Sequence, residues 1–223
     1  MDHTPASVSQ EVPLFPLKTV LCPGGWMPLR VFELRYLDMI GRCQRNGSPF
    51  GVVMLTAGEE VREVDPGDGT QPPGFVTERF APVGTLAEIL AIDKSQAGLW
   101  MIECRGTQRF RIEQTQQMPH GLWTAQIAPL PDDPPVAITE HLAPARDALR
   151  QLLDNLRTHQ PQALETLPLR EPYNWDDCGW VANRWLELLP LTLTLKQQLL
   201  TLDNPMLRLE LVADQLERMG VQS

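Results

Sequence analysis

The chain changes its pattern at Pro131-Asp-Asp-Pro-Pro135, and this break constrains the fold more than any other stretch. Before it, short runs rich in Val, Ile, Phe, Leu and Trp are divided by Gly and Pro, which is typical of strands. After it, apolar residues recur at helical spacing. A stiff, proline-rich connection of this kind is typical of a boundary between units. The sequence therefore predicts a β-rich pseudo-barrel subdomain over residues 10–130 and a helical bundle subdomain over residues 136–221.

The region before the break contains several strand candidates, and the better ones are Phe50–Leu55, Val83–Ile92, Leu99–Cys104, Gln108–Ile112 and Trp123–Ala128. Asp93–Gly98 is a polar, glycine-ended connection that suits a hairpin. Gly106 is interpreted as a second tight turn. Several short neighbouring strands predict an antiparallel barrel or sandwich.

One helix interrupts the strand-rich region. Apolar residues recur at three-residue intervals from Leu34 to Cys43, and Gly47 follows as a helix stop. We expect this helix to pack on the barrel. The segment 57–74 is acidic and lacks periodicity, which is typical of an exposed functional or disordered loop.

The region after the break predicts four helices. Two amphipathic stripes run over Leu142–Leu156 and Trp175–Leu189. Thr194–Gln197 has the form of a capping box, and Asn204-Pro205 is a helix start with proline at the first helical position. Gly220 ends the last helix. Short connections between these helices indicate a bundle.

Charge and composition limit the classes of partner. The formal net charge is −9, from 19 Lys and Arg against 28 Asp and Glu residues. This excess repels phosphate backbones and anionic lipids, which disfavours nucleic acid and membranes as partners. The opening residues lack the apolar run of a signal peptide, and no apolar run is long enough to span a bilayer, so we expect neither a secreted nor a membrane protein. Its four dispersed cysteines predict reduced, mostly buried thiols. We therefore expect a cytoplasmic protein that binds proteins or small molecules.

Motifs for common enzyme chemistry are missing. The sequence contains no P-loop, HExxH, GxSxG or GxGxxG motif. Its histidines are scattered, so a Cys/His dyad could arise only through folding, for instance between Cys104 and His120. A cysteine in an alternating strand is more often buried and inert. We expect no catalytic residue, no metal and no cofactor, and we interpret Glu33, Arg35 and Arg109 as structural ion pairs or caps.

The opening of the chain resembles that of the Lon protease amino-terminal domain family. The resemblance begins with Val12–Leu17, Cys22-Pro-Gly24 and Pro28–Glu33 and continues in the family's order over roughly residues 10–220. Later matching segments are Phe50–Met54, Val83–Thr85, Gly106–Arg111, Leu188–Leu191 and Lys196–Leu200. The motif residues interpreted as structural are Pro13, Phe15, Pro16, Pro23, Gly24, Phe32, Glu33, Arg35, Tyr36, Gly84, Thr85, Gly106, Arg109 and Phe110.

The resemblance implies an α+β fold, in which a six-stranded, PUA-like antiparallel pseudo-barrel with a packed helix is followed by a C-terminal helical bundle. In full-length Lon this region precedes an ATPase and a Ser/Lys peptidase and helps select unfolded or degron-bearing proteins. The chain here is therefore expected to be a non-catalytic protein-binding module. Phe32 and Tyr36 lie four residues apart and are expected to bury together at the helix start.

The leading functional hypothesis is recognition of unfolded or peptide-like segments by an apolar surface. Its candidate residues are Trp26, Met27, Phe75, Arg79 and Phe80, bordered by the acidic loop 57–74. The same aromatic residues could instead close the end of the barrel.

Three alternatives stay open. The chain could be an adaptor or regulator that associates with a protease or with itself through its helical half. It could be a PUA-like RNA binder, although its only local basic run is Arg105, Arg109 and Arg111. It could also be a hydrolase with an unfamiliar site.

Overall fold

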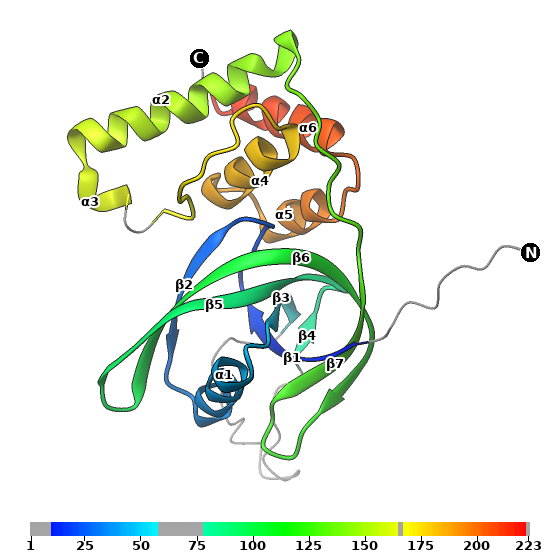
Figure 1. Ribbon diagram of the computed structural model, residues 1–223. Helices are drawn as coiled ribbons and strands as arrows, with labels where there is room; N and C mark the ends of the chain where they lie inside the picture. Colours follow the sequence, from blue (N-terminus) through cyan, green and yellow to red (C-terminus); the bar gives the residue numbers. More distant parts are fainter. Residues whose placement is uncertain (1–9, 58–77, 165–166, 222–223) are drawn as a thin grey trace, which may run out of the picture.

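The computed structural model describes residues 10–57, 78–164 and 167–221 and has the predicted α+β fold (Figure 1). Its strands are β1 (Gln10–Leu17), β2 (Trp26–Val31), β3 (Phe50–Ala57), β4 (Arg79–Phe80), β5 (Val83–Gln96), β6 (Leu99–Gln117) and β7 (Trp123–Pro129). Its α-helices are α1 (Leu34–Asn46), α2 (Ala143–His159), α3 (Pro161–Leu164), α4 (Cys178–Leu188), α5 (Leu193–Leu200) and α6 (Pro205–Arg218). A 3-10 helix, Glu140–Leu142, precedes α2.

The strands form one barrel-like sheet with the order β1-β7-β6-β5-β3-β4. In addition β1 pairs with β3, in parallel, from Leu14↔Gly51 to Leu17↔Met54. The other pairings are antiparallel, and β2 joins the sheet through β6. The described residues thus contain seven strands where six were predicted, and one pairing is parallel. Figure 1 shows α1 at the end of the barrel that lies away from α2–α6.

The predicted turn at Gly106 is not present, because this residue lies within β6, the longest strand. Residues Leu99–Gln117 form one strand, so the predicted turn between two shorter strands is wrong. Gly106 donates its N–H to the carbonyl of Gly25 at 2.8 Å. A Cβ atom at Gly106 would lie 2.2 Å from the carbonyl oxygen of Cys22. Glycine is needed here because the backbone at Cys22 approaches closely. Close approach of another backbone, and not only a turn, explains glycine within a strand.

Local turn signals predicted two boundaries correctly. α1 ends at Asn46 and is capped by Gly47, which has a left-handed φ of 61°. The predicted hairpin is also confirmed, because β5 ends at Gln96, β6 begins at Leu99 and Gly98 has a φ of 75°. Glycine adopts this conformation without the steric cost that a Cβ imposes.

Two side-chain predictions near the start of α1 are wrong. Leu34, placed on the buried stripe from its spacing, is 81% exposed. The predicted contact between Phe32 and Tyr36 is also wrong, since Phe32 is 52% exposed and the Tyr36 ring stacks on Phe15 at 4.2 Å. Phe32 precedes the first helical residue, so a spacing of four does not place the two rings on one helix face.

The helices pack around an apolar core that includes Leu149, Trp185 and Leu209. The β-rich half contributes to the same core through Val20, Cys22, Met54 and Ala81. The predicted start of α6 is confirmed, because the side chain of Asn204 accepts hydrogen bonds from two following amides. The predicted cap of α5 is wrong: α5 begins two residues earlier than Thr194 suggested, and the hydroxyl of Thr192 accepts from Leu195. Gln197 instead donates across to the carbonyl of Val83 at 2.8 Å.

Buried polar groups join the helices to the barrel. Arg109 of β6 donates to the carbonyls of Leu200 at 2.9 Å and Leu202 at 3.0 Å, and to Asp133 at 3.1 Å. Arg208 of α6 also pairs with Asp133, which belongs to the proline-rich connection. The connection is therefore held by charged groups from both halves.

Candidate functional site

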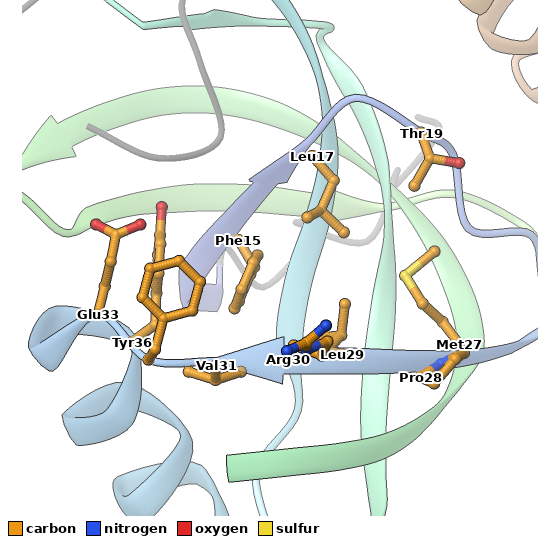
Figure 2. A pocket seen from close by; sticks show the side chains of 11 residues that line it. Phe15, Leu17, Thr19, Met27, Pro28, Leu29, Arg30, Val31, Glu33 and Tyr36 are labelled. Atoms are coloured by element: carbon orange, nitrogen blue, oxygen red, sulfur yellow. The ribbon is translucent and has the colours of Figure 1, made fainter. Parts of the chain in front are cut away.

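A cleft lies between β1 and β2, where these two strands are not paired with each other. It has a volume of about 640 Å³. Its lining residues come from β1, the segment after β1, β2, the β2–α1 junction and α1: Phe15, Leu17, Thr19, Met27, Pro28, Leu29, Arg30, Val31, Phe32, Glu33 and Tyr36. Figure 2 shows the side chains from β1 reaching toward those of β2. We refer to this feature as the β1–β2 cleft.

The cleft has an apolar floor and an exposed apolar rim. Phe15, Leu29 and Val31 are buried and form part of the core that α1 completes. At the rim, the lining residue Phe32 is 52% exposed. Large apolar side chains in a concave site provide contact area for another apolar group.

One end of the cleft is fixed by a buried charge network. The Arg35 guanidinium lies 4.4 Å from the centre of the Tyr36 ring. Arg35 also donates to Glu33 at 2.9 Å, to the carbonyl of Gly121 at 2.9 Å and to Glu78 at 3.3 Å. The carboxylate of Glu33, which lines the cleft, is therefore paired within the protein.

The turn before β2 is held by the helical half. Gly24 has a left-handed φ of 73°, and Gly25 donates to the carbonyl of Cys22 at 2.9 Å, so the chain makes a tight turn here. The buried Glu187 of α4 accepts from the amide of Cys22 at 2.9 Å. Arg184 donates to the carbonyl of Pro23 at 2.9 Å. Helix α4 thus positions the strand that forms one wall of the cleft.

The structure separates the residues predicted to bind peptide. Met27 lines the β1–β2 cleft. Trp26 begins β2, and the Arg170 guanidinium lies 3.6 Å from the centre of its ring. On β4, Arg79 is exposed and Phe80 packs edge-on against Trp123 at 5.5 Å. Phe75 and most of the loop 57–74 lie outside the described residues.

The motif residues interpreted as structural lie in four parts of the chain. β1 contains Pro13, Phe15 and Pro16, and the turn before β2 contains Pro23 and Gly24. The β2–α1 junction contains Phe32, Glu33, Arg35 and Tyr36. β5 contains Gly84 and Thr85, and β6 contains Gly106, Arg109 and Phe110. Within β5, the hydroxyl of Thr85 donates to the carbonyl of Leu21 at 2.6 Å. A Cβ at Gly84 would lie 2.5 Å from the carbonyl oxygen of Val52. These contacts hold the strands together.

Sequence reasoning missed most of the cleft, although one signal was available. Thr19 and Leu29 were not singled out, and Phe15, Leu17 and Phe32 were interpreted only as structural residues. Pro28 lies in the middle of β2. Proline within a strand indicates an edge, because it cannot donate to a neighbouring strand. An edge strand with an apolar face is a candidate binding site.

The cysteine thiols have the environment of buried structural groups. All four, Cys22, Cys43, Cys104 and Cys178, are free and buried. Burial raises the pKa of the Cys104 thiol to about 12, and it also raises the pKa of Cys22 well above its ordinary value. A thiol with a raised pKa is a poor nucleophile near neutral pH. Among the residues that the structure describes, no three His, Cys, Asp or Glu side chains form a metal-binding group, and no helix could cross a membrane.

Comparisons with known proteins agree with the architecture. The model of the ATP-dependent protease La (LON) substrate-binding domain family matches residues 11–218. No curated protein matches the sequence. The crystal structure of a Lon N-terminal domain protein from Xanthomonas campestris has 30% sequence identity and a TM-score of 0.66, covering 92% of this chain and 98% of that chain.

A second solved structure, the N-terminal domain of the Mycobacterium avium complex Lon protease, has 18% identity and a TM-score of 0.55, covering 92% of this chain and 97% of that chain. This second likeness is one of fold. The family match spans nearly the whole chain and agrees with the resemblance of the opening motif. The chain therefore belongs to the family of the ATP-dependent protease La (LON) substrate-binding domain.

Proposed function

We propose that this chain is a non-catalytic module that binds extended, apolar segments of unfolded proteins or peptides in the β1–β2 cleft. The observation that carries the proposal is the large apolar side chain of Phe32, which lines the cleft and is 52% exposed. Exposed apolar side chains beside a concave site favour a binding role over a packing role. Membership of the LON substrate-binding domain family supports the same role.

Of the residues predicted to contact a peptide, Met27 is the one that the cleft supports most directly. Met27 lies within it, so a direct contact with peptide is part of the proposal. The contributions of Trp26, Phe75, Arg79 and Phe80 stay predictions. A reversible recognition module is expected to bind with micromolar affinity, roughly −8 kcal/mol.

Replacing Phe32 by alanine tests the site. Because this ring is half exposed, its loss removes contact area from the ligand and little from the core. We expect binding of an apolar peptide, selected on a peptide array, to weaken by about tenfold, or about 1.4 kcal/mol, as at an aromatic anchor. Fluorescence titration measures the affinity, and circular dichroism melts should give an unchanged Tm.

Leu90→Ala is the matched control, since Leu90 is 49% exposed and lies on β5 outside the cleft. This variant should bind like the wild type. Equal affinities for Phe32→Ala and wild type would exclude the rim from the binding site.

The proposal that the module is non-catalytic has a separate test. The purified protein should neither hydrolyse ATP nor cleave unfolded casein, because the sequence contains no phosphate-binding loop or recognisable nucleophile–base motif. Phosphate release and gel assays measure the two activities against a heat-killed sample. Turnover that survives repurification would contradict the proposal.

A further inference from the structure

The backbone of β2 has one edge that is free to accept another strand. β2 pairs with β6 from Trp26↔Arg105 to Val31↔Trp100, and within the described residues it has no other strand neighbour. In an antiparallel pair, alternate residues direct their N–H and C=O groups toward opposite edges. The carbonyl of Gly25 accepts from Gly106 of β6. Residues an even number of positions from Gly25 therefore face β6, and the intervening residues face the β1–β2 cleft.

The cleft edge of β2 consists of Trp26, Pro28 and Arg30. The amide of Trp26 already donates to the carbonyl of Pro168 at 3.3 Å, which agrees with this assignment. Pro28 has no N–H to donate. Arg30 is consequently the residue of β2 whose N–H and C=O can both serve an incoming strand. A segment that docks antiparallel to β2 would exchange two hydrogen bonds with Arg30. It could donate one more hydrogen bond to the carbonyl of Pro28.

The side chains of β2 alternate between the two faces of the sheet. Leu29 and Val31 are buried, whereas Arg30 is exposed on the outer face. In a docked segment, the residue opposite Arg30 would also point outward. Its two neighbours would point inward, toward the apolar floor that includes Phe15 and Leu29.

The residue of a docked segment that lies opposite Arg30 would meet a positive charge, that of the Arg30 side chain. Of the two charged residues at the cleft, Arg30 and Glu33, Glu33 is paired with Arg35 at 2.9 Å. Arg30 has no ion-pair partner within the described residues. Glu103, opposite Pro28 on β6, shares the outer face and is only a diagonal neighbour of Arg30. A carboxylate directly opposite Arg30 would complement this charge.

We infer that the partner is an extended peptide that pairs with β2 at Arg30 through an apolar–acidic–apolar core, with its Asp or Glu opposite the Arg30 side chain. The inference rests on the proposed function and adds a register, a hydrogen-bonding pattern and a charge preference to it.

The charge preference is tested with three short fluorescent peptides that share a Leu-Xaa-Leu core, where Xaa is Glu, Gln or Lys. Anisotropy titrations on the wild-type chain should give the order Glu, Gln, Lys from tightest to weakest. The difference between Glu and Lys should be about two- to fivefold, as for a cross-strand ion pair. The variant Arg30→Glu should reverse the order, and added salt should reduce the differences.

The backbone pairing is tested with two N-methylated versions of the Glu peptide. Methylation of the Glu nitrogen removes the donor to the carbonyl of Arg30 and should weaken binding by about tenfold. Methylation of the second Leu nitrogen, which faces away from β2 in this register, is the matched control and should have little effect. Equal weakening by both modifications would overturn pairing at Arg30.

The outcomes separate this inference from the proposed function. If all three peptides bind with equal affinity but Phe32→Ala still weakens them, the acidic preference is wrong and the apolar cleft stands. If none of them binds while a different apolar peptide does, the apolar–acidic–apolar core is wrong. If no extended apolar peptide binds, both proposals are wrong.

Discussion

At the scale of single residues, Glu187 combines burial with contacts to both halves of the molecule. Burial raises the pKa of this carboxyl from 4.5 to about 7, although Arg184 and the amide of Cys22 favour the charged form. Arg184 and Lys196 are the cations near it, and the thiol of Cys22 is the other titratable group. A carboxyl at this position is expected to hold its proton more tightly in the folded chain than in the unfolded chain.

The variant Glu187→Gln should therefore flatten the pH dependence of stability. With a folded pKa near 7 and an unfolded pKa near 4.5, the folded state binds more protons between these values. The free energy of unfolding contributed by Glu187 consequently falls as the pH rises through this window. Urea denaturation between pH 5 and pH 8, roughly spanning that window, measures the slope.

Glu171→Gln is the control, because its carboxylate is 76% exposed and should leave the slope unchanged. An unaltered slope in Glu187→Gln would show that Glu187 does not take up a proton on folding.

At the scale of single elements, β6 depends on the absence of a side chain at Gly106. Gly106→Ala should destabilise the protein by about 1–3 kcal/mol, because the new methyl group would overlap the carbonyl of Cys22 and crowd Leu21. Urea unfolding measures the change. Glu113→Ala, an exposed change in the same strand, should alter stability by less than about 0.5 kcal/mol. Equal stabilities of Gly106→Ala and wild type would mean that the backbone at Cys22 can move away at little cost.

The elements also show which features the sequence could predict. The ends of α1 and of the β5–β6 hairpin depend on single glycines with left-handed backbone angles, so local sequence was sufficient. The sequence alone did not show why position 106 needs glycine. The requirement comes from the close approach of the Cys22 backbone, which is remote in sequence. The same limit applies to the cleft, whose walls come from strands that do not pair. Phe32 lies before the first residue of α1, so helical spacing does not bring it onto the same face as Tyr36.

At the scale of the whole molecule, the two halves should unfold together. Arg109 of β6 is buried and its bonds reach the α5–α6 connection and Asp133, while Gln197 of α5 reaches Val83 of β5. Separating the halves would break these hydrogen bonds and expose Val20 and Met54, which pack in the core of the helices. Native-state hydrogen exchange should give the same opening free energy for the most protected amides of β6 and α6.

A lower opening free energy for α6 at all denaturant concentrations would show instead that the helical half opens alone. The predicted division into residues 10–130 and 136–221 would then describe two folding units.

The pairing of β1 with both β3 and β7 has a consequence for synthesis on the ribosome. Gln10 pairs with Ile127, so one edge of the first strand has no partner until the last strand has emerged. The contacts of α4 with Cys22 form later still. Contacts of such long sequence separation slow folding, and an unpaired strand is open to wrong partners while the chain waits. The nascent chain is thus most exposed to aggregation when it is already more than half made, and a chaperone that shields β1 during this interval should raise the yield of folded protein.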